Sequence, residues 1–166
     1  MRHLFSVLAI LVSLAANGQK KDTLVRYFDS QLEPVNKKNA VFVGVVVKDA
    51  FGWNALVYND SMKVIMRGKY TAEDCKLKNG WFIYYNRKGE RYLAGKYEEN
   101  KRTDIWQSWF PSGRVKDSVY FVNDLVEGPA KRYFENGLLE SAGAYKAGMP
   151  DGEWIWHHEN GQIATR

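Results

Sequence analysis

The side chains best suited to chemistry in this sequence lie in the stretch EWIWHHENGQ, residues 153–162. His157 and His158 stand next to the carboxylate of Glu159, and such a group could bind zinc or exchange protons with a substrate. The two imidazoles can act together only if the backbone brings them to one side. Neighbouring residues of a β-strand point to opposite faces, so the chemistry of the pair depends on the element that carries it.

That element belongs to a repeat with a period of 24 residues. The opening position of the repeat is held by Gly80, Asp104, Gly128 and Gly152. Five residues later come Tyr85, Trp109, Tyr133 and His157, and nine residues after the opening position come Gly89, Gly113, Gly137 and Gly161. A fixed period in this range is the signature of a repeat architecture. His157 therefore takes the place of an aromatic strand residue, and we expect the two histidines to be structural.

Each repeat has the pattern of a β-hairpin. The pair Asn136–Gly137 suits a type I′ turn, in which both central residues have positive φ. If this pair is the loop, Glu135 pairs with Leu138 and the remaining register follows by counting. A second reversal must join each hairpin to the next. We therefore expect an all-β fold, an antiparallel meander of tandem β-hairpin repeats that form an elongated twisted sheet.

The repeats are expected to cover residues 53–166, as units 53–79, 80–103, 104–127, 128–151 and an incomplete 152–166. Residues 19–52 are expected to form a divergent hairpin and a valine-rich strand, because RYFDSQL at residues 26–32 echoes RYFENGL at residues 132–138.

Residues 1–18 are typical of a cleaved signal peptide. They combine a positive start, an apolar run from Leu4 to Ala16, and small residues at Ala16 and Gly18. The run is shorter than the ~20 residues that a membrane-spanning helix needs. We therefore expect export to the periplasm or the extracellular medium, with no transmembrane segment in the mature chain.

The composition argues against several function classes. The formal net charge is +5, but the basic residues are scattered among acidic ones and do not form the stripe of a nucleic-acid-binding protein. Cys75 is the only cysteine, and the sequence lacks a Ser-His-Asp arrangement and a glycine-rich phosphate motif. We therefore expect no enzymatic activity, no cofactor, no metal and no nucleic-acid partner.

Alternation along the predicted strands gives the sheet two unlike faces. The apolar face is predicted to carry Phe82, Tyr84, Leu93, Tyr97, Trp106, Phe110, Val115, Val119, Phe121, Phe134, Leu139, Tyr145, Trp154, Trp156 and Ile163. The opposite, mixed face combines aromatic and charged residues, as interaction surfaces do. On it we expect a partner to contact Trp81, Tyr85, Trp109, Tyr120, Tyr133 and His157. The alternative is that these rings only stabilise their cross-strand neighbours.

The glycines of the repeat are expected to have structural roles: Gly80, Gly89, Gly95, Gly113, Gly128, Gly137, Gly143, Gly152 and Gly161. In the predicted register Phe82 lies opposite Gly95, as an aromatic ring covering a strand glycine. The same rule fails for the hairpin pairs Ala130–Gly143 and Trp106–Val119.

The unit GPAKRYFENGLLESAGAYKAG, residues 128–148, resembles the MORN-repeat variant of YwqK-like antitoxin proteins, here in the form of an exported Gram-negative member. The resemblance covers about residues 53–166. It implies a protein partner, such as a toxin, and it supplies no catalytic residues. In Gram-negative relatives similar repeats precede a TonB-type energy-transducer domain.

The first functional hypothesis is a non-enzymatic, exported MORN-like repeat protein that binds another protein, either a toxin or a protein of the cell envelope. One alternative is a module that binds glycans or the cell envelope through exposed Trp and Tyr rings. A further alternative is a repeat region that normally precedes a TonB-type domain, since the last repeat stops at Arg166, within its second predicted strand.

Overall fold

The computed structural model describes residues 22–165, and the predicted signal peptide lies outside this range. The described residues form the strands β1 (Thr23–Phe28), β2 (Pro34–Val35), β3 (Phe42–Asp49), β4 (Gly52–Tyr58), β5 (Val64–Tyr70), β6 (Lys78–Tyr85), β7 (Arg91–Glu98), β8 (Lys101–Trp109), β9 (Val115–Val122), β10 (Leu125–Tyr133), β11 (Leu139–Lys146), β12 (Met149–His157) and β13 (Ile163–Thr165). A short 3-10 helix, η1 (Lys37–Asn39), precedes β3.

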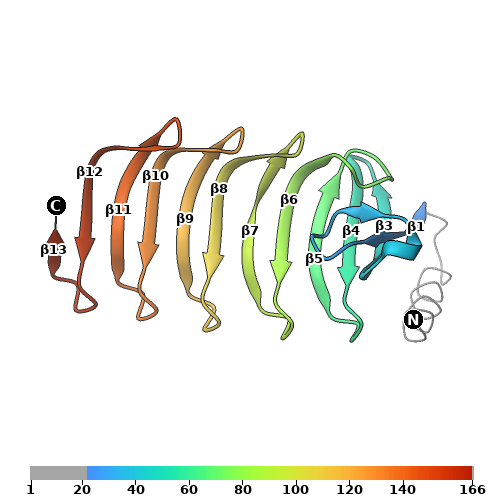
Figure 1. Ribbon diagram of the computed structural model, residues 1–166, viewed down its shortest axis with the longest axis horizontal. Coiled ribbons are helices and arrows are strands. Elements are labelled where there is room, and N and C mark those ends of the chain that lie inside the picture. Colours follow the sequence, from blue (N-terminus) through green and yellow to red (C-terminus); the bar gives the residue numbers. More distant parts are fainter. Residues whose placement is uncertain (1–21, 166) are drawn as a thin grey trace. The chain divides into compact units, whose positions relative to one another are not determined.

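All the strands belong to one open antiparallel sheet, which confirms the predicted all-β meander (Figure 1). From β3 to β13 each strand lies beside the next one in the chain, whereas β1 lies between β2 and β3. Among the described residues, no helix is long and apolar enough to cross a membrane. The contacts divide the sheet into two compact units: unit 1 holds residues 22–80 and 85–89, and unit 2 holds residues 81–84 and 90–165.

Unit 1 contains a closed core. Phe28, Val46, Val57 and Tyr70 are fully buried, and each such side chain contributes ~1.5–3 kcal/mol by leaving water. The phenyl ring of Phe28 lies over Gly44, where a Cβ atom would stand 2.7 Å from it. The N-terminal strands are therefore part of the core of unit 1.

Polar contacts tie the segment that holds these N-terminal strands to the loop after β5 and to the first residue of β6. Arg26 Nε donates a hydrogen bond of 2.7 Å to the carbonyl oxygen of Glu73. Lys78 Nζ lies 2.6 Å from a carboxylate oxygen of Glu33, next to β2. These contacts link positions more than forty residues apart, so β1 and β2 fold back over unit 1.

Unit 2 consists of successive hairpins whose register follows the prediction in the body of each strand. Ala130 lies opposite Gly143 and Trp106 lies opposite Val119, as counted from the sequence. The loop itself differs from the predicted type I′ turn. The Gly137 N–H donates to the Phe134 carbonyl at 2.9 Å, and the Phe134 N–H donates to the Leu138 carbonyl at 2.9 Å. The loop thus has three residues, and Gly137 alone has a positive φ, of 93°.

The physical reason is the side chain of Asn136. Its Oδ1 accepts a hydrogen bond of 2.8 Å from the Leu138 N–H, which favours a type I turn followed by a left-handed glycine. Turns with positive φ at both central residues occur instead at the opposite ends of the strands. They lie at Glu99–Asn100, Asn123–Asp124 and Ala147–Gly148, where one repeat joins the next.

The extra loop residue is absorbed by a bulge, and this changes the predicted faces near the turn. Val115, Leu139 and Ile163 lie opposite Trp109, Tyr133 and His157 respectively. Cross-strand partners share a face of the sheet. These three aliphatic residues therefore belong to the mixed face, and their predicted place on the apolar face is wrong.

The opening position of each repeat forms a second bulge, between repeats. Val126 lies opposite Phe121, but Ala130 lies opposite Val119. Between these two pairs β10 advances by four residues, whereas β9 advances by only two. Gly128, at the centre of this bulge, has a φ of 70°, which glycine adopts without strain. Bulges bend the strand that carries them, and Figure 1 shows the strands of unit 2 bowed along their length.

Candidate functional site

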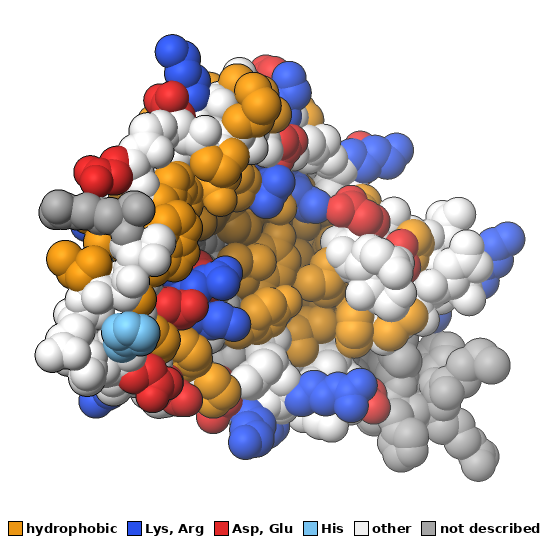
Figure 2. All heavy atoms as spheres, turned by 60° about the vertical axis from the view of Figure 1, so that its left-hand side comes forward, with side chains coloured by type: hydrophobic (Ala, Val, Ile, Leu, Met, Phe, Trp, Pro, Cys, Tyr) orange, Lys and Arg blue, Asp and Glu red, His pale blue; other side chains and the backbone are white. Residues whose placement is uncertain are grey.

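A hollow of about 560 Å³ lies on the apolar face of unit 2. Figure 2 shows hydrophobic side chains lining a hollow of the surface, with charged groups beside them. We name this hollow the apolar groove, and its lining residues are Asp117, Val119, Phe121, Val126, Ala130, Lys131, Arg132, Ser141, Tyr145, Pro150, Trp154 and Trp156. They come from β9, β10, β11 and β12. Alternate residues of a strand share a face, which is why Trp154 and Trp156 both reach it.

Two runs of aromatic rings in mutual contact lie on this face. In the first run the ring centroids of Phe82 and Tyr97 are 5.1 Å apart, those of Tyr97 and Trp106 are 4.9 Å apart, and those of Trp106 and Phe121 are 6.4 Å apart. In the second run Tyr145 meets Trp154 at 5.2 Å, and Trp154 meets Trp156 at 5.8 Å. Such contacts add ~0.5–1.5 kcal/mol each to the burial of the rings.

Two of these tryptophans lie directly over glycines of the preceding repeat. A Cβ atom at Gly95 would overlap with the indole of Trp106, and one at Gly143 would overlap with the indole of Trp154. The sequence placed Phe82 opposite Gly95, but the ring that lies directly on Gly95 is that of Trp106. The relevant partner of each glycine is thus across the junction between repeats and not across its own hairpin.

An ion pair forms the polar wall of the apolar groove. Arg132 Nε donates to Asp117 Oδ1 at 2.7 Å, and the Ser108 hydroxyl donates to Asp117 Oδ2 at 2.7 Å. Burial is the strongest single influence on Asp117 and acts to raise its pKa. The hydrogen bonds from Arg132 and Ser108, together with nearby positive charge, outweigh burial and hold the pKa of Asp117 below its usual range.

None of the six aromatic and His residues predicted for binding lines the apolar groove. Tyr85, Trp109, Tyr120, Tyr133 and His157 are half-buried, while Trp81 is 57% exposed. The guanidinium of Arg91 lies 3.8 Å from the centre of the Trp109 ring and covers it. Tyr133 borders a smaller hollow of about 380 Å³ with Gln107, Arg114 and Ser118. The structure therefore gives the mixed face one exposed tryptophan and a smaller hollow, which only Tyr133 of the six residues lines.

The two histidines lie at the end of β12 and in the turn that follows. His157 pairs with Ile163, and the His158 N–H donates to the Gln162 carbonyl at 2.8 Å. His157 Nδ1 is buried and has no hydrogen-bond partner. Within residues 22–165, no group of three or more His, Cys, Asp or Glu side chains could hold a metal ion.

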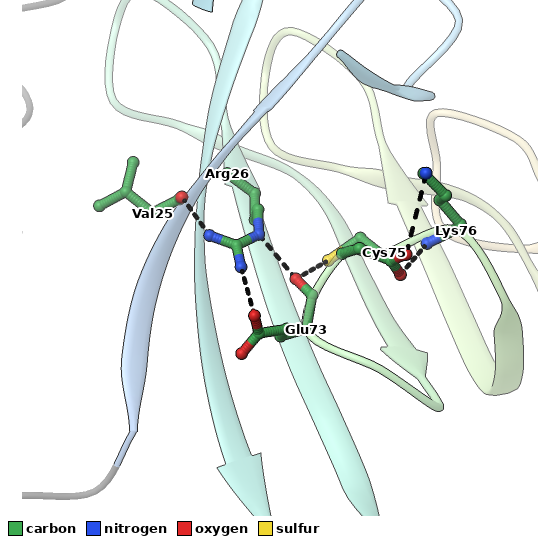
Figure 3. Close-up of polar contacts among 6 residues, drawn as sticks. Val25, Arg26, Glu73, Cys75 and Lys76 are labelled. Atoms are coloured by element: carbon green, nitrogen blue, oxygen red, sulfur yellow. Dashed lines mark hydrogen bonds and ion pairs between the residues drawn. The ribbon is translucent and has the colours of Figure 1, made fainter. Parts of the chain in front are cut away.

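Cys75 lies in the loop after β5, where its thiol is buried (Figure 3). The thiol and Arg26 both donate to the carbonyl oxygen of Glu73, the thiol at 3.7 Å. Burial raises the pKa of the Cys75 thiol to about 12, although the positive charge of Arg26 opposes this effect. A thiol with so high a pKa is a poor nucleophile at neutral pH.

The sequence contained a signal for the apolar groove, but the strand register within single hairpins does not reveal it. At two junctions a glycine is followed eleven residues later by a tryptophan: Gly95 by Trp106, and Gly143 by Trp154. Val119 and Ala130 replace this pair in the intervening junction. Comparison of these columns would have marked Ala130 as the place where the repeat lacks its large ring.

The family model of the MORN repeat variant matches residues 150–166, which include most of β12 and all of β13. No curated protein and no solved structure matches the chain. The chain therefore carries a MORN repeat variant near its C-terminal end.

Proposed function

We propose that this protein is an exported, non-enzymatic binding protein that holds a partner protein in the apolar groove. The observation that carries the proposal is an open hollow of about 560 Å³ whose lining is largely aromatic and aliphatic. Hollows of this size and composition are the usual form of binding sites. Apolar surface left open to water, with polar groups at its border, is likewise typical of interaction sites.

The groove has the features that favour binding over catalysis. Its lining contains one carboxylate, Asp117, which is already held by Arg132 and Ser108. A general acid or base needs a pKa near the working pH, but the pKa of Asp117 is lowered. The predicted export and the resemblance to antitoxin proteins suggest an envelope protein or a toxin as the partner.

Co-purification from the periplasmic fraction tests this proposal. The bait is the tagged full chain, compared with Trp156→Ser in the apolar groove and Trp81→Ser on the mixed face. Both tryptophans are exposed, Trp156 by 41% and Trp81 by 57%, so the pair is matched in residue type and in accessibility. We expect Trp156→Ser to lose the partner and Trp81→Ser to keep it.

The reverse result, with loss of the partner only in Trp81→Ser, would assign binding to the mixed face, as the sequence predicted. In that case Trp109→Ala should also weaken binding. Co-expression with a neighbouring toxin gene, scored by rescue of growth, tests the antitoxin role separately from binding.

A glycan is the second candidate ligand, and one observation favours it. The rings of Trp154 and Trp156 are inclined by only 29°, with their centroids 5.8 Å apart, beside the polar pair Asp117 and Arg132. Flat aromatic surfaces next to polar groups suit the apolar faces and hydroxyls of sugar rings. Retention of the chain on purified cell-wall glycan, and its loss in Trp156→Ser, would support the glycan over the protein partner.

A further inference from the structure

The aromatic packing on the apolar face is interrupted at one repeat junction. At the junctions before and after it, an indole lies on a glycine, with Trp106 on Gly95 and Trp154 on Gly143. At the middle junction the paired residues are Ala130 and Val119, which lie directly opposite each other. This junction therefore lacks a large ring that the same fold accommodates on both sides.

The interruption coincides with the apolar groove. Phe121 ends the first run of rings and Tyr145 begins the second, and both line the groove together with Ala130. Within residues 22–165 the rings of Phe121 and Tyr145 do not contact each other. A ring placed in the groove would thus lie between Phe121 and Tyr145 or Trp154. Phe121 is 8% exposed, and the guanidinium of Arg102, which is paired with Asp124, already lies 4.2 Å from the centre of its ring.

The charges at the groove indicate an uncharged occupant. Arg132 and Asp117 face it, and they neutralise each other in an ion pair of 2.7 Å. Lys131 also borders it, but Ala130 and Arg132 on either side of Lys131 point into the groove, so strand alternation directs the Lys131 side chain to the other face. A charged group that entered the groove would lose its hydration without finding an unpaired opposite charge. An apolar ring has little hydration free energy to lose.

We propose that the apolar groove is completed by an uncharged aromatic side chain, best an indole, that the partner protein presents. This inference rests on the proposed function, because it names the group of the partner that enters the groove. The neighbouring repeats supply the reason for an indole, since they fill the same position with tryptophan. The side chain of Val119 keeps an external ring above the strand, so the ring enters from the open side.

Trp154 offers a direct readout of such binding. The Trp106 indole N–H donates to the Lys96 carbonyl at 3.1 Å, whereas the buried Trp154 indole N–H has no acceptor. The ring of Trp154 is in contact with Tyr145 and Trp156 at the groove, and a new ring beside it should change its environment. The exposed Trp81, on the mixed face, serves as an internal reference.

The experiment is an NMR titration of the ¹⁵N-labelled full chain with N-acetyl-tryptophanamide, with N-acetyl-leucinamide as the control. We expect saturable shifts of the Trp154 and Trp156 indole signals with the tryptophan probe, little shift at Trp81, and weaker effects with the leucine probe. Equal shifts at all three tryptophans, or stronger binding of the leucine probe, would overturn the proposal.

A filled variant provides the matched control. Val119→Gly combined with Ala130→Trp copies the Gly95–Trp106 pair into the middle junction, so the chain supplies its own indole. We expect the variant to fold and to bind N-acetyl-tryptophanamide about tenfold more weakly or worse, since the groove is occupied. If the filled variant fails to fold, Trp156→Ala, which removes a lining ring, takes its place as the test and should also lower the affinity for N-acetyl-tryptophanamide. Unchanged probe binding in a folded variant contradicts the inference.

The outcomes separate this inference from the proposed function. A partner that co-purifies with the wild type and equally with the filled variant leaves the protein as a binding protein but removes the indole from the interface. Saturable binding of the probe without any co-purified protein supports an aromatic ring as the occupant of the apolar groove and argues against a protein as its natural source. Loss of partner and probe together in the filled variant supports both proposals.

Discussion

Units 1 and 2 are built from the same kind of hairpin but differ in how far the side chains on the apolar face are buried. The β4–β5 turn of unit 1 has the hydrogen bonds of the unit 2 turns, from Asn59 to Lys63 and from Met62 to Asn59. Yet the large, fully buried side chains Phe28, Val46, Val57, Met66, Tyr70 and Cys75 all lie in unit 1, and among the described residues only Phe82 joins them from unit 2.

The difference follows from what covers the face. In unit 1, β1 and β2 and the loop after β5 close over the strands, so the aromatic and aliphatic side chains form a core. In unit 2 Ala130 and Phe121 are buried by their neighbours, but the face beside them is hollowed, so similar side chains line the apolar groove. The same sequence chemistry thus gives stability in one unit and an open apolar surface in the other.

The largest effect that tests this comparison concerns the reactivity of Cys75. With its pKa raised to about 12 by burial, the thiol stays protonated at pH 8. We expect alkylation by iodoacetamide to be slower than for an ordinary thiol by on the order of a thousandfold, because the thiolate fraction falls by that factor. Mass spectrometry of the folded and urea-unfolded chain measures the ratio. Rapid alkylation of the folded chain would show that unit 1 is open.

The second test compares a ring from each unit. Phe28→Ala removes a fully buried ring of unit 1 and should cost ~3–5 kcal/mol of unfolding free energy. Phe121→Ala removes a ring that borders the groove, where solvent can enter the space left behind, so we expect ~2–3 kcal/mol. Urea denaturation of both variants gives the values. An equal or larger cost at Phe121 would mean that the groove is closed in solution.

A smaller effect is expected from the ion pair at the groove. The pKa of folded Asp117 is lowered, so its contribution to stability is fully present above its unfolded pKa of about 4. The contribution is lost as the pH falls through the lower folded pKa. Asp117→Asn should therefore remove ~0.5–1 kcal/mol at neutral pH, a value reduced by the solvent exposure of Arg132, and leave stability unchanged at the lowest pH. Denaturation series at pH 7 and at pH 2.5 measure the difference, and an equal loss at both would exclude the ion pair as its source.

The fold could be predicted because its signals are local and repeated. The 24-residue period, the strand alternation and the paired reversals fix an antiparallel meander, and the register in the body of each hairpin follows from them. The loop type could not be obtained from Asn-Gly alone, since the same pair suits two turns. The Asn136 side-chain hydrogen bond to Leu138 selects between them, and the resulting bulge moved Val115, Leu139 and Ile163 to the other face.

The candidate site was harder to predict because it depends on contacts between repeats. The sequence directed attention to aromatic residues among charges, such as Trp109, but Arg91 covers that ring. The apolar groove depends on the absence of a ring at Ala130, and an absence becomes visible only when the Gly and Trp columns of adjacent repeats are compared. Closure of unit 1 depends on long-range contacts, such as Arg26 with Glu73, for which the sequence has no periodic signal.

The smallest expected effect concerns the opening bulge in unit 2. Gly128 and Gly152 occupy this position with φ values of 70° and 74°, whereas Asp104 occupies it with a φ of 64°. A left-handed backbone is strained for aspartate, although its Oδ1 accepts a hydrogen bond of 2.8 Å from the Ile105 N–H. Asp104→Gly relieves the backbone strain, which stabilises the folded chain. It also removes the hydrogen bond and gives the unfolded chain more conformational freedom, and both of these effects oppose the gain. The net stabilisation should therefore be ~0.5 kcal/mol or less. Asp104→Ala keeps the strain without the hydrogen bond and should destabilise by ~1 kcal/mol. Thermal unfolding of the two variants measures both signs, and a gain in stability for alanine would show that this bulge does not require a left-handed residue.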